Sequence, residues 1–127
     1  METLTLEATQ YTPEIHMDPA GTVSIVGKSY PENTFEFYKP VMEWLNNFFE
    51  QDDIPELTVN VELIYFNSSS SKLFFDLFDI LDENNDTTEI TINWIYDEEN
   101  ESAEEAGEDF IEDFEDLTIN LVTKEEE

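Results

Sequence analysis

Residues 57–66, LTVNVELIYF, constrain the fold of this chain most strongly. Apolar side chains alternate from Leu57 to Leu63 and then occupy consecutive positions, a pattern typical of a central strand covered by helices. An apolar pattern with helical spacing begins soon afterwards, at Leu73. A strand that leads directly into a helix is the repeating unit of α/β proteins, so this segment predicts a sheet that is mostly parallel.

The same two patterns recur along the chain and predict one α/β domain over residues 1–127. Pro13, Pro19 and Gly21 predict a loop between the first two strands, which we expect to form a hairpin-like start. Pro40 predicts either a kink in the first helix or a regular helix that begins near Lys39. We expect a mostly parallel or mixed sheet of about four or five strands with three helices, and a loose acidic tail at 123–127. The predicted strands are 4–8, 22–27, 57–66, 89–96 and 117–122, and the predicted helices are about 33–51, 72–83 and a segment within 97–116.

The composition indicates a packed core inside an acidic surface. Apolar residues make up 39% of the 127 positions, whereas 33 Asp and Glu face only four Lys, giving a net charge of −29. Nucleic acids and anionic membranes are poor partners, because binding them requires clustered cations. The chain has no Cys for disulfides, and neither a signal peptide nor a stretch long enough to span a membrane is visible, so we expect a cytoplasmic protein.

Catalytic and metal-binding patterns are weak. His16 is the only histidine, and we expect it to be an ordinary loop residue. Asp82, Asn84 and Asp86 imitate the start of a calcium loop, but the turn glycine and the final glutamate of that motif are missing. Without an oriented base for a nucleophile or a glycine-rich phosphate loop, we predict no enzyme activity, no metal and no cofactor.

Four consecutive serines, residues 68–71, separate the central strand from the following helix. Asn67 or one of these serines is expected to cap the helix, and a cap alone is one sufficient explanation for the segment. However, one capping residue leaves hydroxyl groups spare at an exposed end of the sheet. A phosphate there would be held by the helix dipole and by backbone N–H groups, with Lys72 nearby.

Three segments stand out together: GKSYPENTFEFY (27–38), LIYFNSSSSKLFFDLFDIL (63–81) and NWIYDEENE ending at Glu101. In order and spacing they resemble the SiaC family of bacterial regulatory phosphoproteins, and the resemblance spans nearly the whole chain. It implies a fold similar to STAS domains, the anti-sigma-factor antagonists. It also implies a partner-switching protein that a dedicated Ser/Thr kinase phosphorylates and a PP2C-type phosphatase restores, and whose unmodified form engages a diguanylate cyclase in cyclic-di-GMP signalling.

The resemblance also assigns site residues. The family's phosphoacceptor directly follows the asparagine at the start of the helix, which here makes Ser68 the acceptor, with Ser69 and Ser70 as alternatives and Ser71 as a further competing hydroxyl. The partner-binding surface would comprise Asn67, Ser69, Ser70 and Lys72. Phosphorylation would release the partner by like-charge repulsion or by a clash. An acidic structural protein without a switch and a STAS-type antagonist of an anti-sigma kinase remain alternatives.

Overall fold

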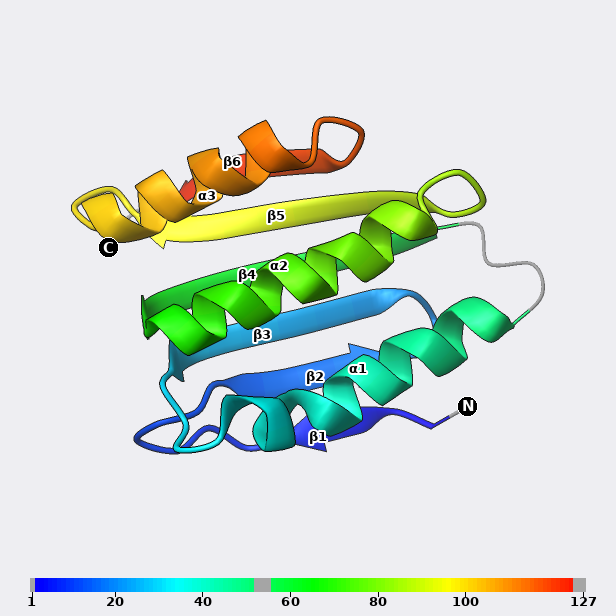
Figure 1. The fold of residues 1–127 in the computed structure, drawn as a ribbon, viewed down its shortest axis with the longest axis horizontal. Coiled ribbons are helices and arrows are strands. Elements are labelled where there is room, and N and C mark those ends of the chain that lie inside the picture. Colours follow the sequence, from blue (N-terminus) through cyan, green and yellow to red (C-terminus); the bar gives the residue numbers. More distant parts are fainter. Residues whose placement is uncertain (1, 52–55, 125–127) are drawn as a thin grey trace.

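The structure, a computed structural model, describes residues 2–51 and 56–124. The described residues form one six-stranded sheet whose strands lie in chain order, β1-β2-β3-β4-β5-β6. Three helices connect the last four strands (Figure 1). The strands are β1 (Leu4–Leu6), β2 (Glu14–Asp18), β3 (Thr22–Ser29), β4 (Glu56–Phe66), β5 (Glu89–Asp97) and β6 (Thr118–Lys124), and the helices are α1 (Thr34–Glu50), α2 (Ser68–Glu83) and α3 (Glu101–Asp113).

The sheet is mixed, and all three helices cover the same face. Strands β3 to β6 pair in parallel, whereas β1, β2 and β3 pair antiparallel. Figure 1 shows α1, α2 and α3 side by side in front of the sheet. The molecule is therefore a two-layer α/β fold, which confirms the predicted sheet type and the three predicted helices.

The strand count and the start of the chain differ from the prediction. The six strands exceed the expected four or five because β2 lies where Pro13 and Pro19 predicted a loop. Ile15 and Met17 alternate into the core from this short strand, and the flanking prolines hid that alternation. The expected pairing of the first two predicted strands is wrong, since β2 lies between them, and His16 is an exposed strand residue rather than a loop residue.

The core lies between the sheet and the helices. From Leu57 to Leu63 in β4 and throughout β5, every second side chain is buried against the helices, while the side chains between them are half-buried. Aromatic rings form the centre: Phe110 lies 4.6 Å from Phe78 and 5.1 Å from Trp94 between ring centroids. Full burial of each such side chain stabilises the fold by about 1.5–3 kcal/mol, so this cluster fixes α2 and α3 on the sheet.

The ends of two elements also refine the prediction. Helix α1 begins at Thr34 behind an Asn33 cap, so a regular helix that starts near Lys39 is wrong; the kink at Pro40 stays a prediction. Strand β6 includes the first two residues of the predicted loose tail, and Lys124 Nζ lies 2.8 Å from Glu62 Oε2. The rest of that tail lies outside the described residues.

Candidate functional site at the start of helix α2

The four serines form the first turn of α2. Strand β4 ends at Phe66, and Asn67 is the N-cap, with an extended backbone and a side-chain Oδ1 that accepts a hydrogen bond from Ser70 N–H at 2.9 Å. The backbone N–H of Asn67 donates to the Ser29 carbonyl at 3.1 Å. Since a helix leaves its first N–H groups unpaired, the asparagine side chain lets the helix start directly at the end of the strand.

The serines in this turn have different surroundings. Ser68 and Ser69 are exposed, as is Lys72, whereas Ser71 is half-buried and Ser70 is fully buried. A modifying enzyme or a partner protein therefore meets Ser68, Ser69 and Lys72 at the surface. The turn presents one side to solvent and the other to the core.

Ser70 belongs to a buried hydroxyl network rather than to the surface. Its Oγ donates to the Ser29 carbonyl at 2.9 Å and accepts from Ser29 Oγ at 2.8 Å. Ser29 Oγ in turn lies 2.6 Å from the Tyr38 hydroxyl. Ser70 has no exposed surface, so its burial disfavours the two roles predicted for it, alternative phosphoacceptor and partner-binding residue, and both stay predictions. The network ties α1 and α2 to β3.

Burial also raises the pKa of the tyrosine in this network, Tyr38. Desolvation raises the pKa of Tyr38 to about 12, partly offset by the hydrogen bond with Ser29, which lowers it. The Tyr38 hydroxyl is the terminal donor of the network, because the one hydroxyl proton of Ser29 is donated to Ser70. Ser29 and Tyr38 both lie within the segment SYPENTFEFY, where sequence reasoning identified a family signature but not this structural role.

The electrostatics of the three described helix starts differ. All three are capped by asparagine, at Asn33, Asn67 and Asn100. The first turns of α1 and α3 contain glutamates, whereas α2 alone among the described helices begins without an acidic residue. Negative charge near a helix N-terminus is stabilising. Although the chain contains 33 Asp and Glu, none of them lies in the first turn of α2. An anion added to this turn would therefore be stabilised by the helix. Comparing the three Asn-capped starts would have revealed this signal from sequence.

The structure does not support a metal site or a calcium loop in the described residues. Within residues 2–51 and 56–124, no group of three or more His, Asp or Glu side chains is arranged to hold a metal ion. Asn84, from the calcium-like motif, caps the end of α2 and donates from Nδ2 to the Ile80 carbonyl at 2.8 Å. No helix in the described segments is both long and apolar enough to cross a membrane.

The fold and this turn define a class: a small two-layer α/β protein that presents serine hydroxyls at a capped helix N-terminus beside the end of a parallel strand. A family model described as SiaC family regulatory phosphoprotein matches residues 6–124. The chain belongs to the SiaC family.

Individual relatives agree with this assignment. An uncharacterized protein of Pseudomonas aeruginosa (strain UCBPP-PA14) is 37% identical over 115 residues, covering 89% of this chain and 90% of the relative. The solved structure of SiaC of Pseudomonas aeruginosa matches with a TM-score of 0.88 and 32% identity, over 98% of this chain and 100% of that chain. The structure of the diguanylate cyclase SiaD in complex with its activator SiaC, also from Pseudomonas aeruginosa, matches with a TM-score of 0.87 and 34% identity, over 95% of this chain and 99% of that chain.

Proposed function

We propose that this chain is a non-enzymatic switch protein in which phosphorylation of Ser68 controls binding to a signalling partner. One observation carries the proposal: Ser68 is an exposed hydroxyl directly after the Asn67 cap, in a first turn without acidic residues. Ser69 is also exposed and stays the alternative acceptor. Ser70 is engaged in the buried network, which leaves the two outer serines for modification.

The modification is an ordinary phosphoryl transfer. A Ser/Thr kinase moves the terminal phosphoryl group of ATP to Ser68 Oγ, ADP leaves, and the hydroxyl proton passes to a base of the kinase. A PP2C-type phosphatase hydrolyses the ester and returns the serine and inorganic phosphate. The phosphate adds about −1.5 to −2 charges at pH 7 and is favoured by the helix dipole. The proposed location is the cytoplasm, where ATP is available to such a kinase.

The proposed partner is a diguanylate cyclase. This follows from the relative SiaC, which is described as the activator of the cyclase SiaD. The unmodified turn, with exposed Ser69 and Lys72 and half-buried Asn67, would contact the cyclase. Phosphate on Ser68 would release it, because a dianion at a packed interface costs desolvation and repels neighbouring carboxylates.

The first test is phosphopeptide mass spectrometry of the protein from its own cells, with and without deletion of the PP2C-type phosphatase. We expect phosphate on Ser68 that accumulates in the deletion strain. Phosphate on Ser69 instead would move the acceptor by one residue. An unmodified peptide under all growth conditions would overturn the switch and leave the serines as a helix cap.

The second test measures product formation by a purified diguanylate cyclase from the same cells, with and without this chain. Wild type and Ser68→Ala are expected to change the cyclase rate alike, and treatment with kinase and ATP is expected to abolish the effect only for wild type. Ser71→Ala, at a half-buried serine of the same turn outside the proposed contact surface, is the matched control and should respond to the kinase as wild type does. A cyclase rate that the chain leaves unchanged in every form would refute the cyclase as partner.

A further inference from the structure

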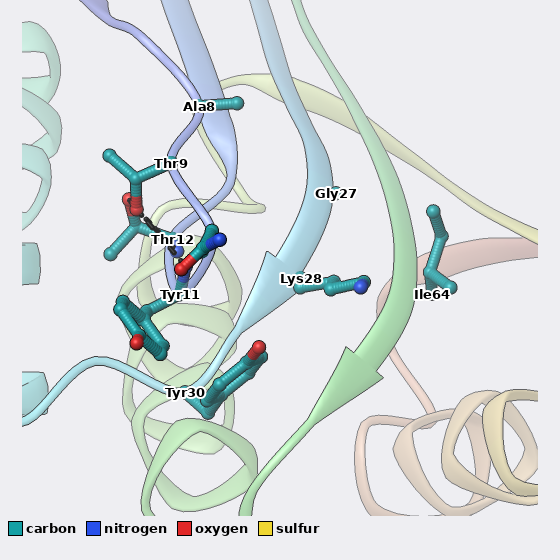
Figure 2. A pocket seen from close by; sticks show the side chains of 9 residues that line it. Ala8, Thr9, Tyr11, Thr12, Gly27, Lys28, Tyr30 and Ile64 are labelled. Atoms are coloured by element: carbon teal, nitrogen blue, oxygen red, sulfur yellow. Dashed lines mark hydrogen bonds between the residues drawn. The ribbon is translucent and has the colours of Figure 1, made fainter.

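The two edges of the sheet differ in how much open strand they present. Strand β1, at one edge, has three residues, whereas β6, at the other edge, has seven (Figure 1). After β1 the chain folds into a turn, in which Thr9 Oγ1 accepts hydrogen bonds from the N–H groups of Tyr11 and Thr12 and lies 2.6 Å from Thr12 Oγ1 (Figure 2). The β1 edge therefore offers little backbone for pairing with another strand.

The β6 edge lacks this protection. Native edge strands are usually blocked by shortness, charge, Pro or a bulge. The seven residues of β6, TINLVTK, contain no Pro and no carboxylate, although the chain has 33 Asp and Glu. Its pairing with β5 runs from Thr118 to Lys124 without a register shift. In the described part of the chain, β6 thus presents a regular strand edge of about 23 Å.

A row of asparagine side chains leads to this edge across the face of the sheet opposite the helices. Asn60, Asn93 and Asn120 are register partners in β4, β5 and β6. Asn93 Nδ2 donates to Asn60 Oδ1 at 2.8 Å, and Asn120 Nδ2 donates to Asn93 Oδ1 at 3.2 Å. Because Nδ2 of the exposed Asn120 points back to β5, its Oδ1 points away from β5. The end of this asparagine ladder therefore offers an acceptor to one more strand.

The helix side of the same edge is both apolar and acidic. Leu121 is half-buried beneath α3. Glu104 Oε2 of α3 accepts a hydrogen bond from the Tyr96 hydroxyl at 3.2 Å, and that hydroxyl lies 3.5 Å from Thr123 Oγ1 of β6. Glu108, one helical turn after Glu104, is exposed. A strand added to β6 would therefore meet apolar surface and carboxylates on its helix side.

We infer that the edge of β6 binds an extended basic segment of a partner protein as a seventh strand of the sheet. Backbone hydrogen bonds to β6 would supply affinity, and alternate side chains would supply specificity. On the face opposite the helices, Asn, Gln, Ser or Thr opposite Asn120 would continue the asparagine ladder. On the helix side, Lys or Arg would lay its aliphatic stem against Leu121 and place its charge near the carboxylates of α3.

Charge favours a basic segment over a second copy of the chain at this edge. Pairing of two β6 strands would bring the two α3 helices toward each other, and the sequence of α3, ESAEEAGEDFIED, is rich in carboxylates. Like charges that face each other across an interface oppose binding. A basic segment is instead attracted by the net charge of −29.

Binding at β6 goes beyond the switch proposed above and does not depend on it. Ser68 lies at the start of α2, directly after β4, and β5 separates β4 from β6. A segment paired with β6 would therefore leave the serine turn free, and phosphate on Ser68 should not change its affinity.

The experiment titrates the full chain with synthetic peptides of about nine residues, ~30 Å when extended. Two peptides have Thr and Asn at alternate positions; the positions between them are Lys in one peptide and Glu in the other. A third peptide is the lysine peptide with every backbone amide N-methylated, which keeps the charge but prevents strand pairing. Binding is followed by the NMR shifts of the amides of the chain.

We expect the lysine peptide to bind saturably, with the largest shifts in β6 and at the side-chain amide of Asn120. The glutamate peptide and the N-methylated peptide should give no shifts in β6. Equal binding of the lysine peptide and its N-methylated form would mean charge attraction alone and would overturn the inference. Equal binding of the lysine and glutamate peptides would contradict a basic segment.

Substitutions at the two edges locate the site. Asn120→Lys places a like charge in the middle of the β6 edge and should weaken binding of the lysine peptide by about tenfold or more. Thr5→Lys is the matched control, because it makes the same change of charge at an exposed residue of the β1 edge, and it should bind nearly as wild type does. Equal losses for the two variants would assign binding to the overall charge and not to β6.

Two further substitutions test the side-chain contacts. Asn120→Ala removes the end of the asparagine ladder and should weaken binding by about twofold to tenfold, as expected for one hydrogen bond. Glu108→Gln should weaken it by about twofold, whereas Glu43→Gln, at an exposed glutamate of α1, should not. Unchanged binding in Asn120→Ala or in Glu108→Gln would contradict the contact that the variant removes.

The remaining outcomes separate this surface from the proposed function and from self-association. Ser68→Asp should bind the lysine peptide as wild type does; a loss would place the peptide at the serine turn and overturn binding at β6. The peptide result holds whether or not Ser68 is phosphorylated in cells. Dimers that form without peptide and that Asn120→Lys dissociates would assign the edge to a second copy of the chain and refute the partner segment.

Discussion

Helices α2 and α3 share the same kind of cap but differ in the charge of their first turns. Each starts after a parallel strand with an asparagine cap, and each cap accepts a hydrogen bond from the N–H three residues on, at 2.9 Å for Asn67 and 3.2 Å for Asn100. The first turn of α3 then contains Glu101 and Glu104, whereas that of α2 contains serines. Carboxylates stabilise a helix N-terminus. The start of α3 therefore has a permanent stabilising negative charge, whereas the start of α2 would gain one only through a reversible modification such as phosphorylation.

The two helix starts are also anchored differently below the surface. Under α2, the hydroxyl groups of Ser29, Tyr38 and Ser70 form a buried network. Under α3, Trp94 Nε1 donates to the Ala103 carbonyl at 2.8 Å, and a Cβ at Gly107 would lie only 2.5 Å from Leu121 Cδ2. Hydrogen bonds between side-chain hydroxyl groups position α2. Helix α3 is positioned by the hydrogen bond from the Trp94 indole and by the close approach of its backbone at Gly107 to Leu121 and Trp94. Substitutions at the two helix starts test this contrast, and the largest effect is expected in the first turn of α2.

Aspartate at two neighbouring positions of α2 should have opposite effects. Ser70→Asp places a charge where the side chain has no exposed surface, and we expect it to lower the free energy of unfolding by about 3 kcal/mol or more. Ser68→Asp adds the same charge to the exposed side of the turn and should be neutral or stabilising by about 0.3–1 kcal/mol. Urea unfolding of both variants measures this. Similar losses for the two would show that the turn does not have distinct buried and exposed sides.

The hydroxyl network under α2 should be visible in alkaline solution. The pKa of Tyr38 is about 12 in the folded protein and 10.0 when the side chain is free. The protonated form is therefore favoured by folding, so its contribution is complete below pH 10 and is lost as the pH rises toward 12. Two pKa units correspond to about 2–3 kcal/mol.

The measurement is the free energy of unfolding between pH 8 and pH 12 for wild type and Tyr38→Phe. The difference between the two proteins should shrink across this interval, since the phenylalanine variant has no hydroxyl to ionise. Tyr11→Phe, which removes a hydroxyl group at an exposed tyrosine outside the network, is the matched control for the substitution itself. Parallel curves for Tyr38→Phe and wild type would contradict the assigned role of the network.

Removal of the asparagine N-caps should change the free energy of unfolding least. It tests the contrast between helix starts with and without carboxylates in the first turn. Asn67→Ala is expected to cost about 1 kcal/mol, the usual value for loss of an N-cap. Asn33→Ala should cost less, because Glu36 still offsets the unpaired N–H groups of α1. Asn100 is unsuited to this comparison, since its Nδ2 also donates to the Ile64 carbonyl at 3.0 Å. Thermal unfolding of Asn67→Ala and Asn33→Ala at low salt compares the two caps. A larger loss for Asn33→Ala would mean that first-turn carboxylates do not distinguish these helices.

Strong periodic patterns made most of the fold predictable. The alternation in β4 and the apolar spacing after the serines predicted β4 and α2, although α2 begins at Ser68 rather than at Lys72, because the Asn67 cap lets the serines form its first turn. The apolar residues of the acidic run, including Ala103 and Phe110, correctly predicted α3. Strand β2 was missed because it is five residues long and flanked by Pro13 and Pro19. So short a strand is defined by its pairing with β1 and β3, which lies outside any local window.

The sequence by itself determined the α/β class of fold, the acidic surface and the position of a hydroxyl-rich turn at a helix start, because periodicity, charge and capping residues are local properties. Only the tertiary structure decided which serine faces the core. Ser70 and its neighbours are chemically equivalent in the chain, and they differ only because Ser29 and Tyr38, from β3 and α1, lie on one side of the turn. The exposure of Tyr65 likewise depends on the bulge in β4, where Ile64 is an extra residue. Contacts between distant segments cannot be read from local patterns.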